Sequence, residues 1–350
     1  MAISQLENFS GVQTGIELSA LATAAGAGSL GLAGALPAVQ PGSNWNAYQD
    51  PFALAVEKVG NKYWLGGGTG NGAVSLFFMF AMNIAAMTPQ AANTFVIGVR
   101  YKRKAGITGA VNIPIFRAAA GVYPSYTIPA NTSEWYLELV FNRTERTVAV
   151  YVEGRFQTTV TITNGTDVAA LTANNWALGF PISGTERLFI TDIYGNADMG
   201  DDSPAGRLGP QDISDVPLKV VSSESWDVTN LTNALGWKDH AADVGKYVVG
   251  TGDGSVLKLK PVDGYTLPIQ STVNGVLLQV RAAHIQGNPA DVRGKIVRGT
   301  HEDTKDQVLN GVVSLSNPAL RLVNNSRGND ESIPATALSG LEASLTVIAR

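Results

Sequence analysis

The 350-residue sequence contains no cysteine, and only 15% of its residues are charged. Without cysteine the chain can form neither disulfide bonds nor thiolate metal sites, so packing and assembly must provide its stability. The net charge is −4, with acidic and basic residues mixed along the chain, so the sequence lacks the basic surface by which proteins bind nucleic acid. The three histidines, His240, His284 and His301, have no metal-ligand spacing. We therefore expect neither nucleic-acid binding nor transition-metal catalysis.

Long hydrophobic runs are also missing. The most apolar one, VSLFFMFAMNIAAM from Val74 to Met87, is shorter than the roughly 20 residues that a membrane-spanning helix needs. We expect a buried strand there instead. The amino-terminal residues MAISQLENFSG lack the basic start and the apolar core of a secretion signal. Neither a membrane span nor secretion is expected.

Motifs for two enzyme classes occur only in incomplete form. Residues 26–31 match G-x-G-x-x-G, but Gly34 and Pro37 would break the helix that must follow a dinucleotide-binding loop. The carboxylates Glu134 and Glu138 share one face of a predicted strand, about 13 Å apart, whereas a retaining glycosidase needs about 5 Å. We interpret them as solvent-facing partners of cross-strand bases. The chain is expected not to be an enzyme.

What the sequence does contain is β-strand alternation. WYLELVFNRTERTVAVYVEGRFQTTVTI, from Trp135 to Ile162, holds three alternating runs, and the Glu153-Gly154 pair between the last two signals a tight hairpin. Similar runs separated by Gly, Asn, Pro and Thr recur at residues 94–104, 187–195 and 275–286. This pattern predicts an all-β, antiparallel sandwich or jelly roll.

The pattern also predicts how the chain is organised. Residues 18–42 are rich in Ala, Gly and Leu, which suits either close backbone packing or a flexible arm. We therefore expect residues 1–44 to form an amino-terminal arm or an extra strand segment. Residues 45–350 are expected to form one β-sandwich, with a loop-rich, acidic excursion at 196–264.

The order of the segments resembles the concanavalin A-like (laminin G-like) jelly rolls found as structural proteins of tailed-bacteriophage particles. The resemblance covers residues 45–350 and rests on FVIGVRYK, EWYLELVFNRTERTVAVYVEGRF, RLFITDIYGN, GRLGPQDISDVPLKVVSSESWD and SIPATALSGLEASLTVIAR. The Ala/Gly-rich segment has no counterpart in the family. The resemblance implies a non-enzymatic component of the tail, baseplate, fibre or head decoration, which acts through contacts with other virion proteins. It also implies a homo-oligomer located in the virion after assembly in the cytoplasm of the bacterial host.

The alternative function on the same jelly-roll fold is recognition of a carbohydrate or a host receptor. Its expected site is an exposed aromatic ring beside acidic and amide side chains, with a host surface glycan as the partner. The ligand-binding candidates are Asp192, Tyr194 and Asn196.

Calcium is the one cofactor for which the sequence offers a candidate site. Laminin G-like domains often hold calcium near such acidic loops, and hard oxygen ligands in a flexible loop are what calcium takes. The alternative is a loop that is merely solvated, since the order of ligands in an EF-hand is absent. The candidate ligands are Asp192, Asp198, Asp201 and Asp202.

Overall fold

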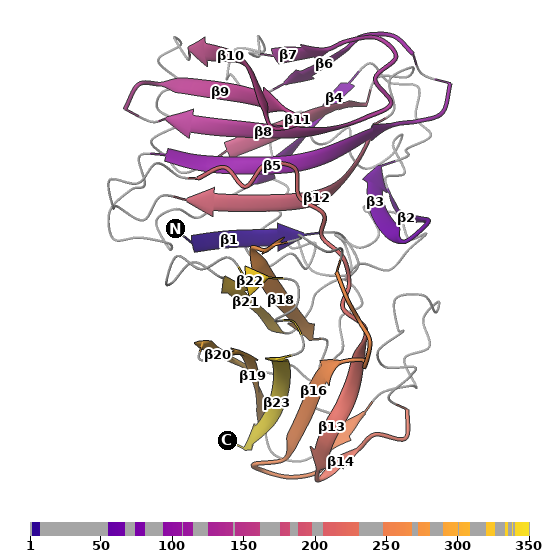
Figure 1. The fold of residues 1–350 in the computed structure, drawn as a ribbon, viewed down its shortest axis with the longest axis vertical. Helices are drawn as coiled ribbons and strands as arrows, with labels where there is room; N and C mark the ends of the chain where they lie inside the picture. Colours follow the sequence, from indigo (N-terminus) through magenta and orange to yellow (C-terminus); the bar gives the residue numbers. More distant parts are fainter. Residues whose placement is uncertain are drawn as a thin grey trace. The chain divides into compact units, whose positions relative to one another are not determined.

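The computed structural model describes residues 2–7, 55–66, 74–80, 94–106, 108–114, 125–142, 144–161, 176–182, 188–197, 206–230, 248–267, 272–280, 290–299, 301–308, 320–325, 333–334, 338 and 340–349. Most of these residues lie in strands, and every strand pair among them is antiparallel. The predicted all-β, antiparallel class is therefore confirmed (Figure 1). The Ala/Gly-rich segment at 18–42 lies outside the described residues.

The chain divides into two compact units. Unit 1 comprises residues 1–10 and 14–213, and unit 2 comprises residues 11–13 and 214–350. This differs from the expected single sandwich over residues 45–350, because each unit has its own sheet and its own buried apolar residues. The boundary falls inside the expected excursion at 196–264, and that excursion itself carries strands between residues 218 and 261.

Unit 1 is built on an eight-stranded sheet with the order β10-β9-β8-β5-β12-β3-β2, in which β1 pairs additionally with β12. Its strands are β1 (Ala2–Glu7), β2 (Ala55–Val59), β3 (Lys62–Gly66), β5 (Thr94–Arg103), β8 (Glu134–Asn142), β9 (Thr147–Val152), β10 (Arg155–Thr161) and β12 (Leu188–Ala197). Two further pairs, drawn behind this sheet in Figure 1, are β4 (Val74–Phe80) with β11 (Trp176–Ile182), and β6 (Val111–Pro114) with β7 (Ser125–Ile128).

The predicted meander is confirmed as β8, β9 and β10, which pair in sequence. The turn between β9 and β10 consists of Glu153 and Gly154, and both have positive φ angles, 49° and 74°. Two successive positive φ angles are the signature of a type I′ turn, whose twist matches that of the flanking strands. The backbone N–H of Tyr136 donates to the Glu153 carboxylate at 2.6 Å, which ties the turn back to β8.

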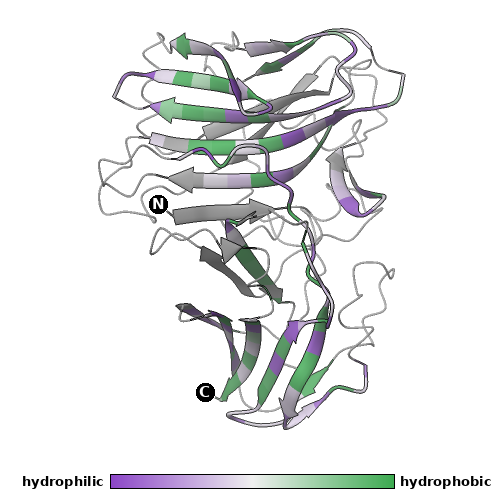
Figure 2. Ribbon diagram, viewed as in Figure 1, coloured by the Kyte–Doolittle hydropathy of each residue, from purple (hydrophilic) through white to green (hydrophobic). Residues whose placement is uncertain are grey.

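One face of the large sheet is apolar and forms the core of unit 1. Direct cross-strand partners lie on the same face, and the pairs Tyr101–Trp135, Val99–Leu137 and Leu139–Val150 are all buried. The Tyr101 and Trp135 rings stack, with centroids 5.5 Å apart. Figure 2 shows the resulting hydrophobic bands along β5, β8 and β9.

The opposite face carries Arg100, Tyr136, Glu138 and Tyr194, and we call it the polar face. The register sets this: Arg100 pairs with Tyr136, and Gly98 pairs with Glu138 on one side and Tyr194 on the other. Both faces of β8 are buried over most of its length, so something must cover the polar face as well.

Unit 2 contains a five-stranded sheet of order β13-β16-β23-β19-β20 and three two-stranded pairs, β14–β15, β17–β22 and β18–β21. The strands of the sheet are β13 (Leu218–Glu224), β16 (Val256–Pro261), β19 (Ala290–Arg298), β20 (His301–Val308) and β23 (Leu341–Ala349). The paired strands are β14 (Trp226–Asp227), β15 (Val249–Gly250), β17 (Thr272–Val273), β18 (Gly275–Val280), β21 (Leu320–Asn325) and β22 (Ile333–Pro334).

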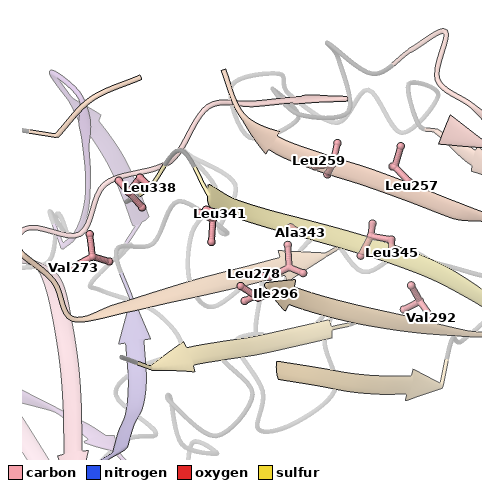
Figure 3. Packing of buried hydrophobic residues seen from close by; sticks show 10 residues of the cluster. All are labelled: Leu257, Leu259, Val273, Leu278, Val292, Ile296, Leu338, Leu341, Ala343 and Leu345. Atoms are coloured by element: carbon pink, nitrogen blue, oxygen red, sulfur yellow. The ribbon is translucent and has the colours of Figure 1, made fainter. Parts of the chain in front are cut away.

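The sheet of unit 2 is amphipathic. Buried side chains including Leu257, Ile296 and Leu345 gather into one cluster (Figure 3). On the other face, charged side chains form cross-strand ion pairs, such as Arg293 with Asp306 at 2.7 Å. Both partners of this pair are about half exposed, so its contribution to stability is small. The apolar cluster is therefore what stabilises unit 2.

Candidate functional site: a charge network beneath a strap

The polar face of the large sheet is covered by residues 206–213, the last segment of unit 1, which we call the strap. The strap has no strand or helix of its own. Its backbone N–H groups at Leu208, Gly209 and Ile213 donate to side chains that rise from the sheet. A segment without regular structure needs such partners, because a buried backbone amide without an acceptor costs free energy.

Glu138 anchors one end of the strap. Its carboxylate is completely buried, and it lies on β8 between apolar neighbours. One oxygen accepts the Tyr194 hydroxyl at 2.6 Å and the Gly209 N–H at 2.9 Å, and the other pairs with Arg207 at 2.9 Å. Arg207 also donates to the Gly154 carbonyl at 2.8 Å. A buried carboxylate with this many donors is compensated, so its place in the interior is tolerated.

Asp192 anchors the other end. It occupies a β-bulge of β12, where the register shifts, and its φ angle is +49°. One carboxylate oxygen receives both Lys62 and the Arg100 Nε, the latter at 2.8 Å, and the other accepts the Ile213 N–H at 3.2 Å. Lys62 also reaches Asp212 at 2.7 Å. The bulge thus turns Asp192 toward two bases and the strap.

Two tyrosines connect the anchors. Tyr136 and Tyr194 stack with their ring centroids 6.5 Å apart, and both are completely buried. The Tyr136 hydroxyl donates to the Asp192 carbonyl at 3.0 Å, while the Tyr194 hydroxyl donates to Glu138 and accepts from Leu208. Each anchor is therefore held in place by a phenol from the strand on the other side of β5.

Gly98 makes room for these rings. A β-carbon at this position would lie 2.1 Å from the Tyr194 ring and 2.7 Å from the Tyr136 hydroxyl, well inside van der Waals contact. Gly98 lies in the middle of β5, where glycine would otherwise weaken the strand. Only a residue without a side chain fits here.

The electrostatic surroundings in the network keep its tyrosines neutral and Arg100 positively charged. Burial is the main cause that raises the pKa of Tyr136 and of Tyr194 far above that of a free tyrosine, and the nearby carboxylates add to it. Burial alone would lower the pKa of Arg100, but its hydrogen bond with Asp192 and the charge of Asp192 together raise it. The phenols stay protonated and the guanidinium stays charged at neutral pH.

The sequence-based ligand residues have different surroundings from those expected. Tyr194 and Asp192 are both buried, whereas the expected glycan site required an exposed ring beside a carboxylate. The backbone of Asn196 pairs with Ile3 and with Val96. Tyr194 and Asp192 are thus brought into one network by the fold, but that network contacts the strap.

Of the four candidate calcium ligands, the structure describes only Asp192. Asp192 has three donors on its two oxygens, while Asp198, Asp201 and Asp202 lie outside the described residues. Among the residues that the structure describes, no three acidic or histidine side chains form a group that could hold a metal ion. Within those same residues, no helix has the length and apolar character to cross a membrane.

Glu138 was mispredicted from the sequence, and Arg207 and Lys62 were not predicted at all. Glu138 was expected to face solvent together with Glu134, but only Glu134 does so, as the exposed partner of Arg100 at 3.3 Å. The available signal was local: Glu138 lies among apolar residues on β8, and Gly98 interrupts an equally apolar β5. A glycine paired with a glutamate between apolar residues indicates that another side chain packs over the glycine and contacts the glutamate.

No protein-family model matches the sequence, and no curated protein matches it. Solved structures with some similarity include the globular domain of T. cruzi calreticulin, with 8% identity, 43% of this chain and 81% of that chain covered, and a TM-score of 0.28. A tandem pair of CBM22 domains from Paenibacillus barcinonensis has 9% identity, coverage of 85% and 83%, and a TM-score of 0.24. A botulinum neurotoxin type C structure, described as interacting with two ganglioside molecules, has 9% identity, coverage of 86% and 92%, and a TM-score of 0.28. Scores this low do not transfer an activity or a ligand to this chain.

Proposed function

We propose that this chain is a non-catalytic structural protein of a tailed-phage particle that acts through contacts with other virion proteins. The proposal that the chain is not an enzyme rests on what its buried carboxylates bind. Glu138 and Asp192 are the buried acidic side chains among the described residues, and both are bonded to bases and to backbone N–H groups of the strap. A general acid or nucleophile must reach a substrate, whereas these groups hold a segment of their own chain.

The phage assignment rests on the sequence resemblance over residues 45–350. Low charge, the absence of cysteine and an apolar segment at 18–42 suit a protein that is stabilised by assembly. The proposed partners are other virion proteins and further copies of the same chain. Tail, baseplate, fibre and head decoration are the proposed locations.

Mass spectrometry of purified particles, combined with the oligomeric state of the isolated chain, tests this proposal. Copies in the hundreds would assign the chain to a head decoration or tail tube, and a few to about a dozen would assign it to a baseplate or fibre. Absence from the particle would refute the proposal. So would polysaccharide hydrolysis that disappears in Glu138→Gln while the variant stays folded.

A second candidate function is binding of a carbohydrate on a host surface. The observation that favours it is the exposed aromatic ring of Phe156, 57% of which is accessible at the start of β10. An exposed ring on a protein surface offers an apolar platform for the C–H face of a pyranose. Binding of the whole chain to immobilised glycans tests this function.

A further inference from the structure

The hairpin of β9 and β10 presents a pair of aromatic rings at one edge of the large sheet. Phe156 and Tyr151 are direct cross-strand partners. Their rings meet edge to face, with centroids 5.5 Å apart and planes inclined by 69°. Phe156 is 57% exposed, and Tyr151 is half-buried beneath it. The pair leaves much of one ring open to solvent, while the other ring supports it.

The supporting ring is fixed by the strap. The Arg207 guanidinium lies 3.5 Å from the centroid of the Tyr151 ring. Arg207 is itself held by buried Glu138 at 2.9 Å and by the Gly154 carbonyl at 2.8 Å. A chain of contacts therefore runs from a buried carboxylate to the exposed ring. A platform fixed in advance loses little conformational entropy when a ligand binds.

The residues next to Phe156 in sequence do not belong to this pair of rings. Arg155 pairs with Val152 and Phe156 pairs with Tyr151, so the side chains of Arg155 and Phe156 lie on opposite faces of β10. Gln157 lies at the register shift of β10, and its side chain is held by hydrogen bonds with the Arg155 carbonyl and the Tyr126 hydroxyl, both at 3.1 Å. The exposed surface is therefore formed by Phe156, with Tyr151 and Arg207 as its support.

The surroundings fit a saccharide better than a protein partner. A stable protein interface buries about 800 Å² on each side around an apolar centre. Among the described residues, the other exposed large hydrophobic side chains are Val59, Val221 and Val308. Val221 and Val308 belong to unit 2, and Val59 lies in β2, at the other end of the strand order from β10. The one exposed ring of the β9–β10 hairpin offers far less apolar area than a protein interface needs, and it matches the apolar face of a pyranose.

We propose that Phe156, Tyr151 and Arg207 form a saccharide-binding platform, on which the apolar face of a pyranose ring stacks against Phe156. The proposal rests on the second function proposed above and locates its site on the β9–β10 hairpin. It moves the glycan site away from Asp192 and Tyr194, whose side chains are buried.

The test uses the full chain and four variants of single exposed residues. Wild type is screened on an array of bacterial surface polysaccharides, and the affinity for the best binder is measured by calorimetry. Phe156→Ala and Phe156→Leu remove the ring, and each should weaken binding roughly tenfold or more. Phe156→Tyr keeps the ring and should stay within about threefold of wild type. Val59→Ala, at the opposite edge of the sheet, is the matched control and should bind like wild type.

The possible outcomes test the location of the site at Phe156 and the carbohydrate-binding function separately. If wild type binds none of the saccharides, the carbohydrate function is refuted, and the platform with it. If wild type binds but Phe156→Ala and Phe156→Leu, with unchanged melting temperatures, bind equally well, the platform is refuted and the function stands. Should both ring-free variants melt early, wild-type saturation-transfer NMR decides: transfer from aromatic protons to the saccharide supports the platform, and its absence overturns it.

Discussion

At the scale of single residues, Asp192 has a strained backbone and a carboxylate that forms two ion pairs. Its φ angle of +49° belongs to the left-handed region, which Asp and Asn tolerate better than other residues with side chains. Changing it to asparagine therefore keeps the backbone conformation and the shape but removes the charge. The two bases beside it, Lys62 and Arg100, are mostly buried, and they would keep only their exposed partners, Asp212 and Glu134.

We expect Asp192→Asn to lower the free energy of unfolding of unit 1 by about 2–3 kcal/mol, because the two bases would lose their buried partner and keep only exposed ones. Urea denaturation followed by tryptophan fluorescence measures it. Glu134→Gln is the control: this exposed partner of Arg100 should cost no more than about 1 kcal/mol. Equal losses in the two variants would contradict the assigned burial.

Among the described residues, three tyrosines are completely buried, and we expect them to cause a steep loss of stability in alkali. Burial raises the pKa of Tyr101, Tyr136 and Tyr194 above the ordinary value of 10.0. The unfolded chain ionises these groups near pH 10 and the folded chain does not, so their stabilisation is complete below pH 10 and is lost as the pH rises above it. The slope should approach about 1.4 kcal/mol per pH unit for each phenol.

This alkaline transition is measured by the absorbance of tyrosinate together with circular dichroism. Of the ten tyrosines in the sequence, these three should ionise only when the β signal disappears. Gradual ionisation of all ten in the folded chain would show that the polar face is open to solvent.

At the scale of elements, β5, β8 and β12 are locked in register by the rings packed over Gly98. Gly98→Ala should destabilise unit 1 by about 1–3 kcal/mol or more, because the new methyl group would overlap the Tyr194 ring. Gly109→Ala is the matched control, since a β-carbon there meets nothing within 4 Å. Melting curves of both variants measure the difference. An unchanged melting temperature in Gly98→Ala would mean that Tyr136 and Tyr194 can move aside without loss of stability.

The same strands show how far the sequence alone could lead. Alternation found β5, β8, β9, β10 and β12 almost to the residue, because each has one apolar face whose period is visible locally. The Glu153-Gly154 turn was equally legible, since Gly154 readily takes the positive φ angle that a tight hairpin turn requires. These features depend on neighbours in sequence, and local patterns therefore predict them.

The strap could not be predicted in this way. Its contacts join residues far apart in sequence, such as Arg207 with Glu138 and Asp212 with Lys62. No local period connects a glutamate on β8 to an arginine some seventy positions later. For the same reason, Asp192 and Tyr194 were expected at the surface, although the strap buries both.

At the scale of the whole molecule, the two units are expected to unfold separately. Each has a core of its own, and that of unit 2 is the cluster around Ile296 and Leu257. Ile296→Ala should cost unit 2 about 2–5 kcal/mol through the cavity it creates. Scanning calorimetry should show two transitions, of which this variant lowers one. Asp192→Asn should lower the other. A single transition that moves in both variants would mean that the units unfold as one.

The pairing of β1 has a consequence for synthesis of the chain. Residues 2–7 pair with residues 193–197 in β12, so the first strand leaves the ribosome long before its partner exists. At about 5–20 residues per second, the wait is roughly 10–40 s. Throughout that time, residues 2–7 have unpaired backbone groups that a chaperone could shield. This part of the sheet therefore closes only after residues 193–197 have been synthesised, and slowing the ribosome before the codon for residue 193 should prolong the vulnerable interval.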